Sequence, residues 1–316
     1  MIFKKPKFWD LKKPNILAYL LLPLTVVISI NNILLNFSKK KKYEKIKSIC
    51  VGNIYLGGTG KTPLTVELYK ITKNIGYSVS VGKKYYKSQM DEQEILKQNT
   101  NLNVDFSRKR LIENAIKNQT KLIIFDDGLQ DRLIEYDMKF VCFDADQWIG
   151  NSFLLPSGPL REKITSLRKY DAVFLKKNHK NDGTQKIENI IKNINSKIKI
   201  FYTYYKPINL ENFESSKKYI IFSGIGNPRN FRKLIEQSKI NIVEEIIFPD
   251  HYNYTQKDIE NLEKKARSLN SEVITTEKDF TKISKLTSNN IKCLKVELVI
   301  ENKENLKSFL IKELNE

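Results

Sequence analysis

The feature that most constrains the fold is a glycine loop, "LGGTGKTP", placed between a buried strand and a helix. The run "KIKSICVGNIYL" before it predicts a short buried strand, and "PLTVELYKITKNIGY" after it has apolar residues at helical spacing. Such a loop directs backbone N–H groups and a helix N-terminus at anionic oxygens. The arrangement therefore predicts a parallel sheet with a phosphate-binding loop at its edge, and a nucleotide as the ligand.

Eight loop residues are expected to bind the nucleotide. A lysine at the end of such a loop reaches the β- and γ-phosphates, and the hydroxyl beside it meets Mg²⁺, which assigns these roles to Lys61 and Thr62. The first glycine of the usual pattern would fall at position 55, where this chain has tyrosine, and two later glycines supply the flexibility instead. The expected set is Tyr55, Leu56, Gly57, Gly58, Thr59, Gly60, Lys61 and Thr62.

Strand patterns alternate with helical patterns along the chain, which predicts an α/β fold with a parallel sheet and helices on both faces. A polar stretch from about Lys176 to Lys199 and an extended connector, "KIFYTYYKP", precede a second series of strand and turn units. We expect three parts: an apolar membrane-anchor helix with basic flanks at 1–45, a P-loop domain at 46–205, and a smaller C-terminal α/β domain at 206–316.

The N-terminal segment Pro14 to Phe37 is almost free of charge and has lysines on both sides. A membrane span needs about 20 apolar residues, and the clean run from Ile16 to Ile30 is shorter. Pro23 predicts a kink in it. The segment is expected either to span a membrane with its asparagines near the interface or to lie on it as a shallow anchor, and a buried helix is the alternative. The flanking lysines leave the orientation undecided, and the nucleotide loop places the rest of the chain in the cytoplasm.

The formal net charge of +19 raises the question of nucleic acid. Lysines far outnumber arginines, whereas readers of base edges depend on arginine forks. An anionic membrane surface, or an anionic substrate lying on it, suits a lysine excess better, so no nucleic-acid partner is expected. The three cysteines, Cys50, Cys142 and Cys293, have no metal or redox spacing, which indicates a reducing compartment.

Two adjacent acids follow the apolar run "LIIF". Asp126 and Asp127 are expected at the carboxyl edge of the sheet, where ligands bind in open α/β folds and where one acid holds Mg²⁺ directly or through water. The alternative is a turn that merely begins with aspartate. The predicted metal set is therefore Thr62, Asp126 and Asp127.

Two further residues are candidates for acid–base chemistry. Asp91, in "MDEQEILK", could orient a hydroxyl acceptor and take its proton, but the same pattern fits a helix N-cap with an acidic first turn. His251 lies in "FPDHYNYT", where a lone histidine is either an acid–base participant or structural. The other histidine, His179, lies in a lysine-rich run and is expected to be solvated.

Six stretches follow one another from residue 51 to about 282: "VGNIYLGGTGKTP", "DDGLQD", "GNSFLLPSGPLRE", "FSGIGNP", "FPDHYNYT" and "ITTEKD". Together they resemble one family, the tetraacyldisaccharide 4′-kinases or lipid A 4′-kinases, which has these stretches in the same order after a similar apolar N-terminal segment. The members of that family are bacterial inner-membrane enzymes that phosphorylate the 4′-hydroxyl of a tetraacylated glucosamine disaccharide 1-phosphate.

The resemblance implies a P-loop kinase that uses ATP and Mg²⁺ to make the bis-phosphorylated lipid IVA. It implies the catalytic roles of Lys61 on the phosphates, of Asp91 as the base, and of His251 as its partner, brought toward it from the second domain by closure. Gln130 matches the glutamine of the family's "DDG-x-Q" motif. The implied partners are the acylated disaccharide lipid and the inner-membrane surface, with the catalytic part on the cytoplasmic face. The oligomeric state is not readable, and a monomer is the default expectation.

Arg161, in "PLRE", is a candidate contact for the substrate's phosphate, since a guanidinium fork matches phosphate oxygens. The alternative is a structural ion pair with Glu162 or another acid.

The chain departs from the family pattern at two places. "GKKYYK", at Gly82 to Lys87, stands where the family usually shows "SRGYG", so that Lys83 keeps the positive charge and Tyr85 the ring. Asp131 replaces the histidine that usually ends the "DDG-x-QH" motif.

Two other classes of protein are weighed against the kinase. Partitioning ATPases have similar deviant loops, but they carry a lysine just before the glycine pair, where this chain has Leu56. A basic, membrane-anchored protein without enzymatic activity would leave the glycine loop and the paired acids without a purpose.

Overall fold

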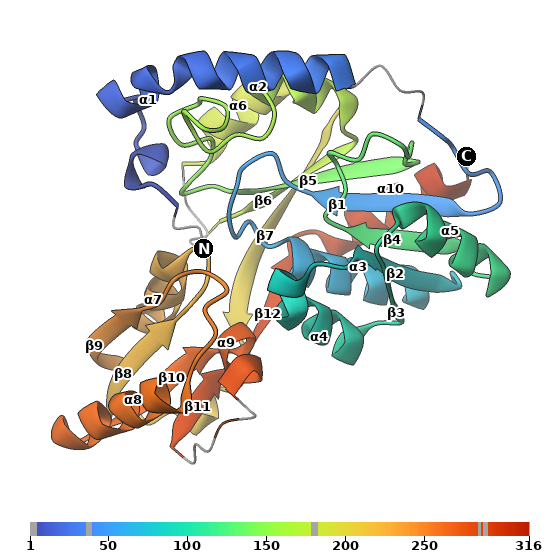
Figure 1. Ribbon diagram of the computed structural model, residues 1–316. Coiled ribbons are helices and arrows are strands. Elements are labelled where there is room, and N and C mark those ends of the chain that lie inside the picture. Colours follow the sequence, from blue (N-terminus) through green and yellow to red (C-terminus); the bar gives the residue numbers. More distant parts are fainter. Residues whose placement is uncertain (1–4, 36–39, 178–182, 284–285, 287–289, 316) are drawn as a thin grey trace. The chain divides into compact units, whose positions relative to one another are not determined.

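The computed structural model describes residues 5–35, 40–177, 183–283, 286 and 290–315 (Figure 1). His179 lies outside the described residues. Two compact units are distinguished: a larger unit of residues 5–85, 96–204 and 300–316, and a smaller unit of residues 86–95 and 205–299. The chain therefore passes from one unit to the other four times between residues 5 and 316. The expected domain ranges stay a prediction.

The larger unit contains the glycine loop and most of an eight-stranded sheet of order β12-β7-β6-β5-β1-β4-β2-β3, in which residues 205–207 of β7 and 296–299 of β12 are counted with the smaller unit. Neighbouring strands from β7 to β3 pair in parallel, which confirms the expected α/β class. The connector expected before the second half is itself a strand of this sheet, β7. The strands are β1 (Lys47–Gly52), β2 (Val79–Lys84), β3 (Leu102–Asp105), β4 (Leu122–Asp126), β5 (Met138–Asp144), β6 (Ala172–Lys176), β7 (Lys199–Pro207) and β12 (Val296–Ile300).

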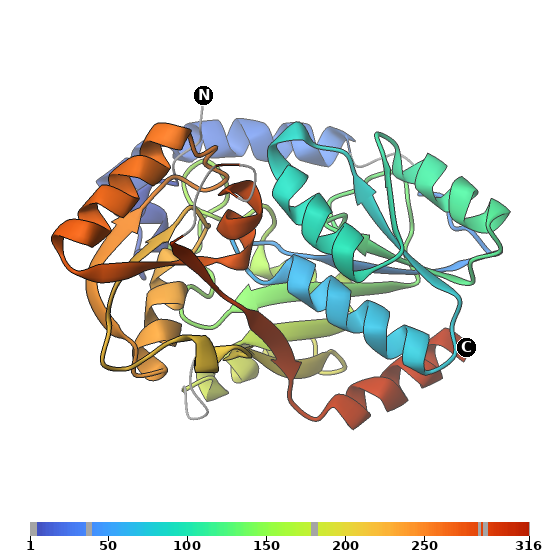
Figure 2. The same cartoon turned by 90° about the horizontal axis from the view of Figure 1, so that it is seen from below.

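Helices cover this sheet because the crossovers between parallel strands need them. Figure 2 shows the C-terminal helix α10 running beside α3. Phe309 of α10 packs on the sheet, with its ring centroid 6.2 Å from that of Phe140 and 5.8 Å from that of Phe201. The helices are α3 (Lys61–Asn74), α5 (Arg108–Lys117), the 3-10 helix η3 (Ile164–Lys169), α6 (Gln185–Ile194) and α10 (Lys303–Asn315).

The smaller unit is a second α/β structure, as expected. Its sheet has the order β11-β10-β8-β9, with every pair parallel and an apolar cluster on each face. Helix α4 (Met90–Asn99) begins in this unit and ends in the larger one. The other elements are η2 (Lys87–Gln89), η4 (Leu210–Asn212), β8 (Lys218–Ser223), α7 (Pro228–Gln237), β9 (Asn241–Ile247), α8 (Gln256–Ser268), β10 (Ser271–Thr276), α9 (Glu277–Ile283) and β11 (Ile291–Leu294).

The apolar N-terminal segment follows the short η1 (Lys7–Asp10) and forms two helices, α1 (Ile16–Leu20) and α2 (Leu22–Leu35). The break at Leu21 comes just before Pro23, which then lies in the first turn of α2, where a missing N–H is tolerated. In the part of the chain that the structure describes, no helix has both the length and the apolar character needed to cross a bilayer.

A polar contact fastens α2 to the loop that carries "GNSFLLPSGPLRE". The Thr25 hydroxyl lies 2.7 Å from that of Ser157 and accepts a hydrogen bond from the Ser157 backbone N–H at 3.2 Å. Trp9 reinforces the attachment, since its indole N–H donates to the Pro156 carbonyl at 3.0 Å. One face of the helices is thereby buried while many large apolar side chains stay exposed: Ile16, Leu17, Tyr19, Leu20, Leu24, Val26, Val27, Ile28 and Ile30.

Candidate active site

The glycine loop leaves β1 and enters α3 in a conformation that depends on glycine at two points. Gly57 has φ +147° and Gly60, the N-cap of α3, has φ +89°, a region that side chains disfavour. Asn53 holds the loop closed, because its side-chain N–H₂ donates to the Tyr55 carbonyl at 2.6 Å and to the Gly57 carbonyl at 3.2 Å. The loop therefore presents the N-terminus of α3, as an anion site requires.

Tyr55, which stands where the usual pattern has glycine, has a structural place in the larger unit. Its side chain is buried, and its hydroxyl donates to the carboxylate of Asp10 in η1. Lys5 also contacts this pair, 3.1 Å from the tyrosine oxygen and 2.7 Å from Asp10. The tyrosine thus links the loop to the chain that leads into α1.

Asp126 is the last residue of β4, next to β1, and its carboxylate meets the loop. The Thr62 hydroxyl donates to Asp126 Oδ2 at 3.0 Å, and Lys83 Nζ of β2 lies 2.6 Å from the same oxygen. Both members of the Lys83–Asp126 ion pair are buried. Sequence order separates these residues, and the sheet order β1-β4-β2 brings them together.

The other oxygen of Asp126 fits a divalent cation. Asp126 Oδ1 is buried and has no hydrogen-bond partner among the described residues, and the Thr62 hydroxyl lies beside the same carboxylate. Within the described ranges, no group of three or more His, Cys, Asp or Glu side chains is placed to hold a metal. That donor set suits Mg²⁺, which binds through one or two carboxylates and takes its other ligands from substrate phosphates and water.

Asp127 holds the two cations of the site. Lys61 Nζ lies 3.8 Å from Asp127 Oδ2, and Arg161 Nη1 donates to Asp127 Oδ1 at 3.3 Å. Burial alone would raise the pKa of Asp127, but the charges of Lys61, Arg161, Lys83 and Arg108 outweigh it and lower that pKa to about 2. Asp127 is therefore ionised at neutral pH. The ion pair expected as the alternative for Arg161 exists, with Asp127 as its acid.

The turn after β4 carries the departure from the family pattern. Asp131 accepts a hydrogen bond from Arg108 of α5 at 2.9 Å and caps the turn by accepting from the Leu133 backbone N–H at 2.8 Å. Arg108 also donates to the Asp127 carbonyl. Asp131 thus holds Arg108, which in turn contacts the backbone of the paired acids, and a neutral histidine, with one acceptor nitrogen, could not accept from both Arg108 and Leu133.

The predicted acid–base pair forms within the smaller unit. His251 Nδ1 lies 3.2 Å from Asp91 Oδ2, and the Asp91 side chain is only 3 % exposed. Two lysines of α9 approach the same oxygen, Lys278 at 3.5 Å and Lys282 at 3.3 Å. Asp91 is thus more than a residue of the acidic first turn of α4, although its other oxygen does accept from the Glu92 backbone N–H at 2.9 Å.

The charge around Asp91 keeps it ionised. Burial would raise its pKa, but the hydrogen bond from His251 and the charges of Lys278 and Lys282 outweigh burial, so the pKa lies well below its usual range. A carboxylate that is ionised at neutral pH can accept a proton, as the predicted base must.

One expectation about this pair is corrected. We expected domain closure to bring His251 of the second half toward Asp91 of the first. Residues 86–95, however, belong to the same compact unit as residues 205–299, so the pair is already formed inside one unit. Sequence position misled the prediction, because a short segment in the first half of the chain folds with the second half.

Each unit contains charged residues to which sequence reasoning gave no role beside the predicted site residues. Lys83 was noted only for its charge, and the pairing of Lys278 and Lys282 with Asp91 was not foreseen. Lys278 lies in the motif "ITTEKD" and Lys282 lies just after it. The two lysines are four residues apart, a spacing that puts them on one face of a helix. That spacing is the signal that could have grouped them.

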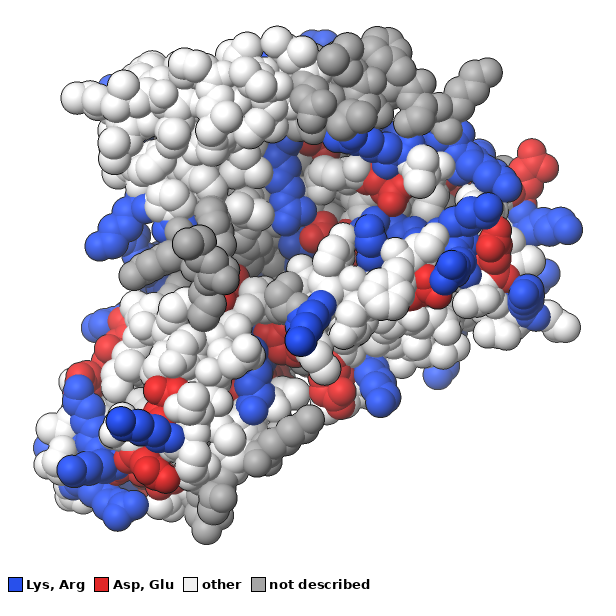
Figure 3. All heavy atoms as spheres, in the orientation of Figure 1, with Lys and Arg blue, Asp and Glu red and all other residues white. Residues whose placement is uncertain are grey.

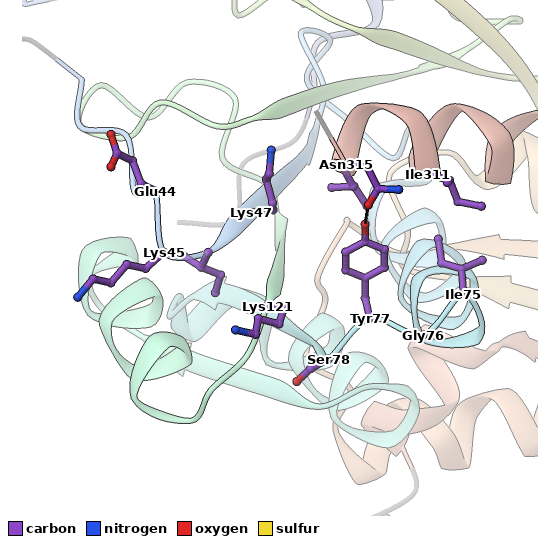
Figure 4. Close-up of a pocket in the computed structure, with 12 residues that line it drawn as sticks. Glu44, Lys45, Lys47, Ile75, Gly76, Tyr77, Ser78, Lys121, Ile311 and Asn315 are labelled. Carbon is purple, nitrogen blue, oxygen red and sulfur yellow. Dashed lines mark hydrogen bonds between the residues drawn. The ribbon is translucent and has the colours of Figure 1, made fainter.

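A pocket of the larger unit lies away from the glycine loop (Figure 4). Its lining includes Lys47 at the start of β1 and residues that precede β2 and β4, so it is at the amino edge of the parallel sheet. The Tyr77 hydroxyl donates to the Asn315 side chain at its border at 2.9 Å. None of the predicted site residues lines it.

Comparison with known proteins decides the family. The family model described as tetraacyldisaccharide-1-P 4′-kinase matches residues 16–315. The chain belongs to this family. A tetraacyldisaccharide 4′-kinase of Pelagibacter ubique is 42 % identical over 318 residues, covering 100 % of this chain and 99 % of the relative. One of Rickettsia conorii is 35 % identical, covering 98 % of each chain.

A solved structure supports the fold of this tetraacyldisaccharide 4′-kinase family member. The crystal structure of LpxK from Aquifex aeolicus in complex with ATP matches with a TM-score of 0.68 at 24 % identity, covering 95 % of this chain and 100 % of that one. The likeness confirms the predicted P-loop NTPase-like α/β fold.

Proposed function

We propose that this chain transfers the γ-phosphoryl group of ATP to the 4′-hydroxyl of tetraacyldisaccharide 1-phosphate, giving the bis-phosphorylated lipid IVA. The observation that carries the proposal is the meeting of Lys61, Thr62, Asp126 and Asp127 behind the glycine loop, in a chain of this kinase family. The loop and the acids are what phosphoryl transfer needs to hold a nucleotide and to neutralise its charge.

The larger unit is proposed to hold the nucleotide. Backbone N–H groups from Tyr55 to Thr62 and the N-terminus of α3 bind its phosphates, and Lys61 moves from Asp127 to the β- and γ-phosphates. Thr62, Asp126 and Asp127 would hold Mg²⁺, which neutralises charge on the phosphates when bound. Asp127 holds Lys61 close, at 3.8 Å, until the nucleotide arrives.

The smaller unit is proposed to supply the base. The acceptor's O–H bond breaks as its oxygen bonds to the γ-phosphorus, the bond between that phosphorus and ADP breaks, and the proton passes to Asp91. The burial of Asp91 and the histidine that contacts its carboxylate support this assignment.

The acylated substrate suggests where the enzyme works, which is proposed to be the cytoplasmic face of the inner membrane. Ile16, Leu20 and Val27 of α1 and α2 are 78 %, 69 % and 63 % exposed. Figure 3 shows that the surface over α1 and the first part of α2 is almost free of charged side chains. An apolar strip of this kind fits the acyl region of a bilayer, and the lysine excess suits anionic headgroups.

The experiment is an assay with labelled ATP and the disaccharide 1-phosphate in detergent or vesicles. The expected result is a doubly phosphorylated lipid that forms only in the presence of acceptor and enzyme. Asp91→Asn should lower kcat by about 10²–10⁴-fold and leave nucleotide affinity unchanged, because it removes a general base. Lys61→Ala should weaken both nucleotide binding and turnover.

Two results would contradict the proposal. Hydrolysis of ATP without any requirement for the lipid acceptor would favour a partitioning-type ATPase. An equal loss of nucleotide binding and turnover in Asp91→Asn would assign Asp91 to folding rather than to proton transfer.

A further inference from the structure

The imidazole of His251 has a charged group opposite each of its nitrogen atoms. Nδ1 lies 3.2 Å from Asp91 Oδ2, and Nε2 lies 3.4 Å from Lys278 Nζ. Lys278 also bonds to Asp250 at 3.1 Å, which holds its ammonium group in place beside the ring. All of these groups belong to the smaller unit.

A lysine ammonium group can only donate hydrogen bonds, and an ionised carboxylate can only accept them. The Nε2–H tautomer would therefore set an N–H against the ammonium and a lone pair against the carboxylate. The imidazolium form would still set its Nε2–H against the ammonium, and Asp250 Oδ1, at 3.9 Å, is too far from Nε2 to accept it. Only the neutral Nδ1–H tautomer pairs both nitrogens.

We propose that Lys278 is a positioning residue that fixes His251 as the neutral Nδ1–H tautomer, with this N–H directed at Asp91. The inference concerns the state of the ring, and only its consequence for catalysis rests on the proposed function. The position of the ring proton follows from the chemistry of the two charged partners, the ammonium group and the carboxylate.

Lys278 is charged in this setting. Burial would lower its pKa, but the carboxylates of Asp250, Asp91 and Glu92 outweigh burial and raise it. The charged groups facing the ring are Asp91 from α4, Asp250 from the turn after β9, and Lys278 from α9, while Lys282 of α9 contacts Asp91 but not the ring.

Two hydrogen bonds hold the backbone N–H of His251 within the smaller unit. His251 has φ +57°, and its N–H donates both to Asp250 Oδ1 at 3.0 Å and to the Gly224 carbonyl at 3.2 Å. Asp250 thus contacts the backbone of His251 and the side chain of Lys278 together.

The consequence for the reaction is that His251 and Asp91 have different roles. Nδ1 already carries its proton, and Nε2 accepts a hydrogen bond from Lys278, so the ring cannot take up the acceptor's proton while Lys278 stays in place. His251 then orients the Asp91 carboxylate, and Asp91 alone receives the proton.

The test is the ¹⁵N spectrum of the imidazole in the nucleotide-free, full-length protein labelled at histidine. Only two histidines are present, and His179→Gln assigns the signals. At pH 7.5, His251 should show a protonated Nδ1 and a Nε2 of the unprotonated, pyridine type. A wild-type spectrum with a protonated Nε2, as the Nε2–H tautomer or as imidazolium, would overturn the proposal whatever any variant does.

Variants then test whether Lys278 is the cause. Lys278→Met should shift His251 toward the Nε2–H tautomer that free histidine prefers, or toward imidazolium, whereas Lys278→Arg should keep the wild-type pattern. Lys282→Met is the matched control, since it removes an equal charge next to Asp91 without touching the ring, and it should leave the tautomer unchanged.

Folding and function are read separately in this experiment. The circular dichroism and the cooperative thermal unfolding of each variant show that the protein is folded. An unchanged tautomer in a folded Lys278→Met variant, or the same shift in Lys282→Met, would overturn the assignment to Lys278. Because no substrate is present, failure of the kinase assay would not alter this result, and a wrong tautomer would not refute the kinase.

Discussion

At the scale of single residues, Asp127 stabilises the fold through its ion pairs with Lys61 and Arg161. Its folded-state pKa of about 2 lies below the ordinary value of 3.8. The stability that its ionised form contributes is therefore fully present above about pH 4 and is lost as the pH falls toward 2. Lys61 and Arg161 would be left as neighbouring positive charges without it.

We expect Asp127→Asn to lower the free energy of unfolding at pH 7 by about 1–3 kcal/mol, because it removes one member of a partly buried, hydrogen-bonded charge cluster. Thermal unfolding of wild type and variant, measured from pH 7 to pH 2, should show the difference shrinking below pH 4. Glu211→Gln, an exposed carboxyl in η4, is the control and should show no such convergence. A difference that stays constant down to pH 2 would contradict this account.

At the same scale, sequence reasoning found the residues whose roles depend on local motifs. The glycine loop with Lys61 and Thr62, and the acids at the end of an apolar strand, could be recognised because each is defined by neighbours in sequence. The Lys83–Asp126 ion pair could not be, because it exists only where β2 lies next to β4. Which strands become neighbours is a property of the whole sheet.

At the scale of elements, the hydrogen bonds of an N-terminal capping box explain why α8 begins where it does. Thr255 is its N-cap: its side chain accepts a hydrogen bond from the Asp258 N–H, and the Asp258 carboxylate accepts one from the Thr255 N–H at 2.8 Å. This reciprocal capping box satisfies two backbone donors that the helix itself cannot pair. These bonds also lower the pKa of Asp258.

Thr255→Ala should therefore destabilise the start of α8 by about 1 kcal/mol, whereas Thr255→Ser should keep the cap. Hydrogen exchange of the backbone N–H groups in the first turn of α8 is the suitable measurement, because a chain with two compact units need not unfold in one step. Equal exchange rates in the two variants would show that the hydroxyl does not stabilise the helix.

The sequence predicted whether a segment forms a helix or a strand, but it did not predict which elements pack against each other. Alternating strand and helix patterns predicted both sheets, and the structure confirms the α/β class in each unit. Helix α4 was placed by sequence with the glycine loop, yet residues 86–95 fold with 205–299. Periodicity indicates what a segment forms and which face is buried, but long-range packing decides which partner buries it.

At the scale of the whole molecule, the proposed docking on an anionic bilayer depends on the apolar residues of α1 and α2 and on the net charge of +19. We expect the double substitution Ile16→Glu and Leu20→Glu to weaken binding to phosphatidylglycerol vesicles by about 10²–10⁴-fold, since each large apolar side chain contributes about 1.5–3 kcal/mol when removed from water. Co-sedimentation with vesicles measures this effect.

The matched control is Leu133→Glu, because Leu133 is 64 % exposed and lies outside the two helices. It should leave vesicle binding nearly unchanged. Added salt should weaken binding of the wild type by screening its lysines, and phosphatidylcholine vesicles should bind less well than anionic ones. Loss of binding in Leu133→Glu equal to that of the double variant would mean that the helices are not the docking surface.

The repeated passage of the chain between its two units has a consequence for protein engineering. A chimaera that exchanged residues 205–299 alone for those of a relative would bring a foreign histidine and foreign lysines to the native Asp91. The transferable module is instead a split one, made of residues 86–95 together with 205–299. Mutations that tune the proton acceptor and its surroundings are accordingly expected to coevolve across more than a hundred intervening positions.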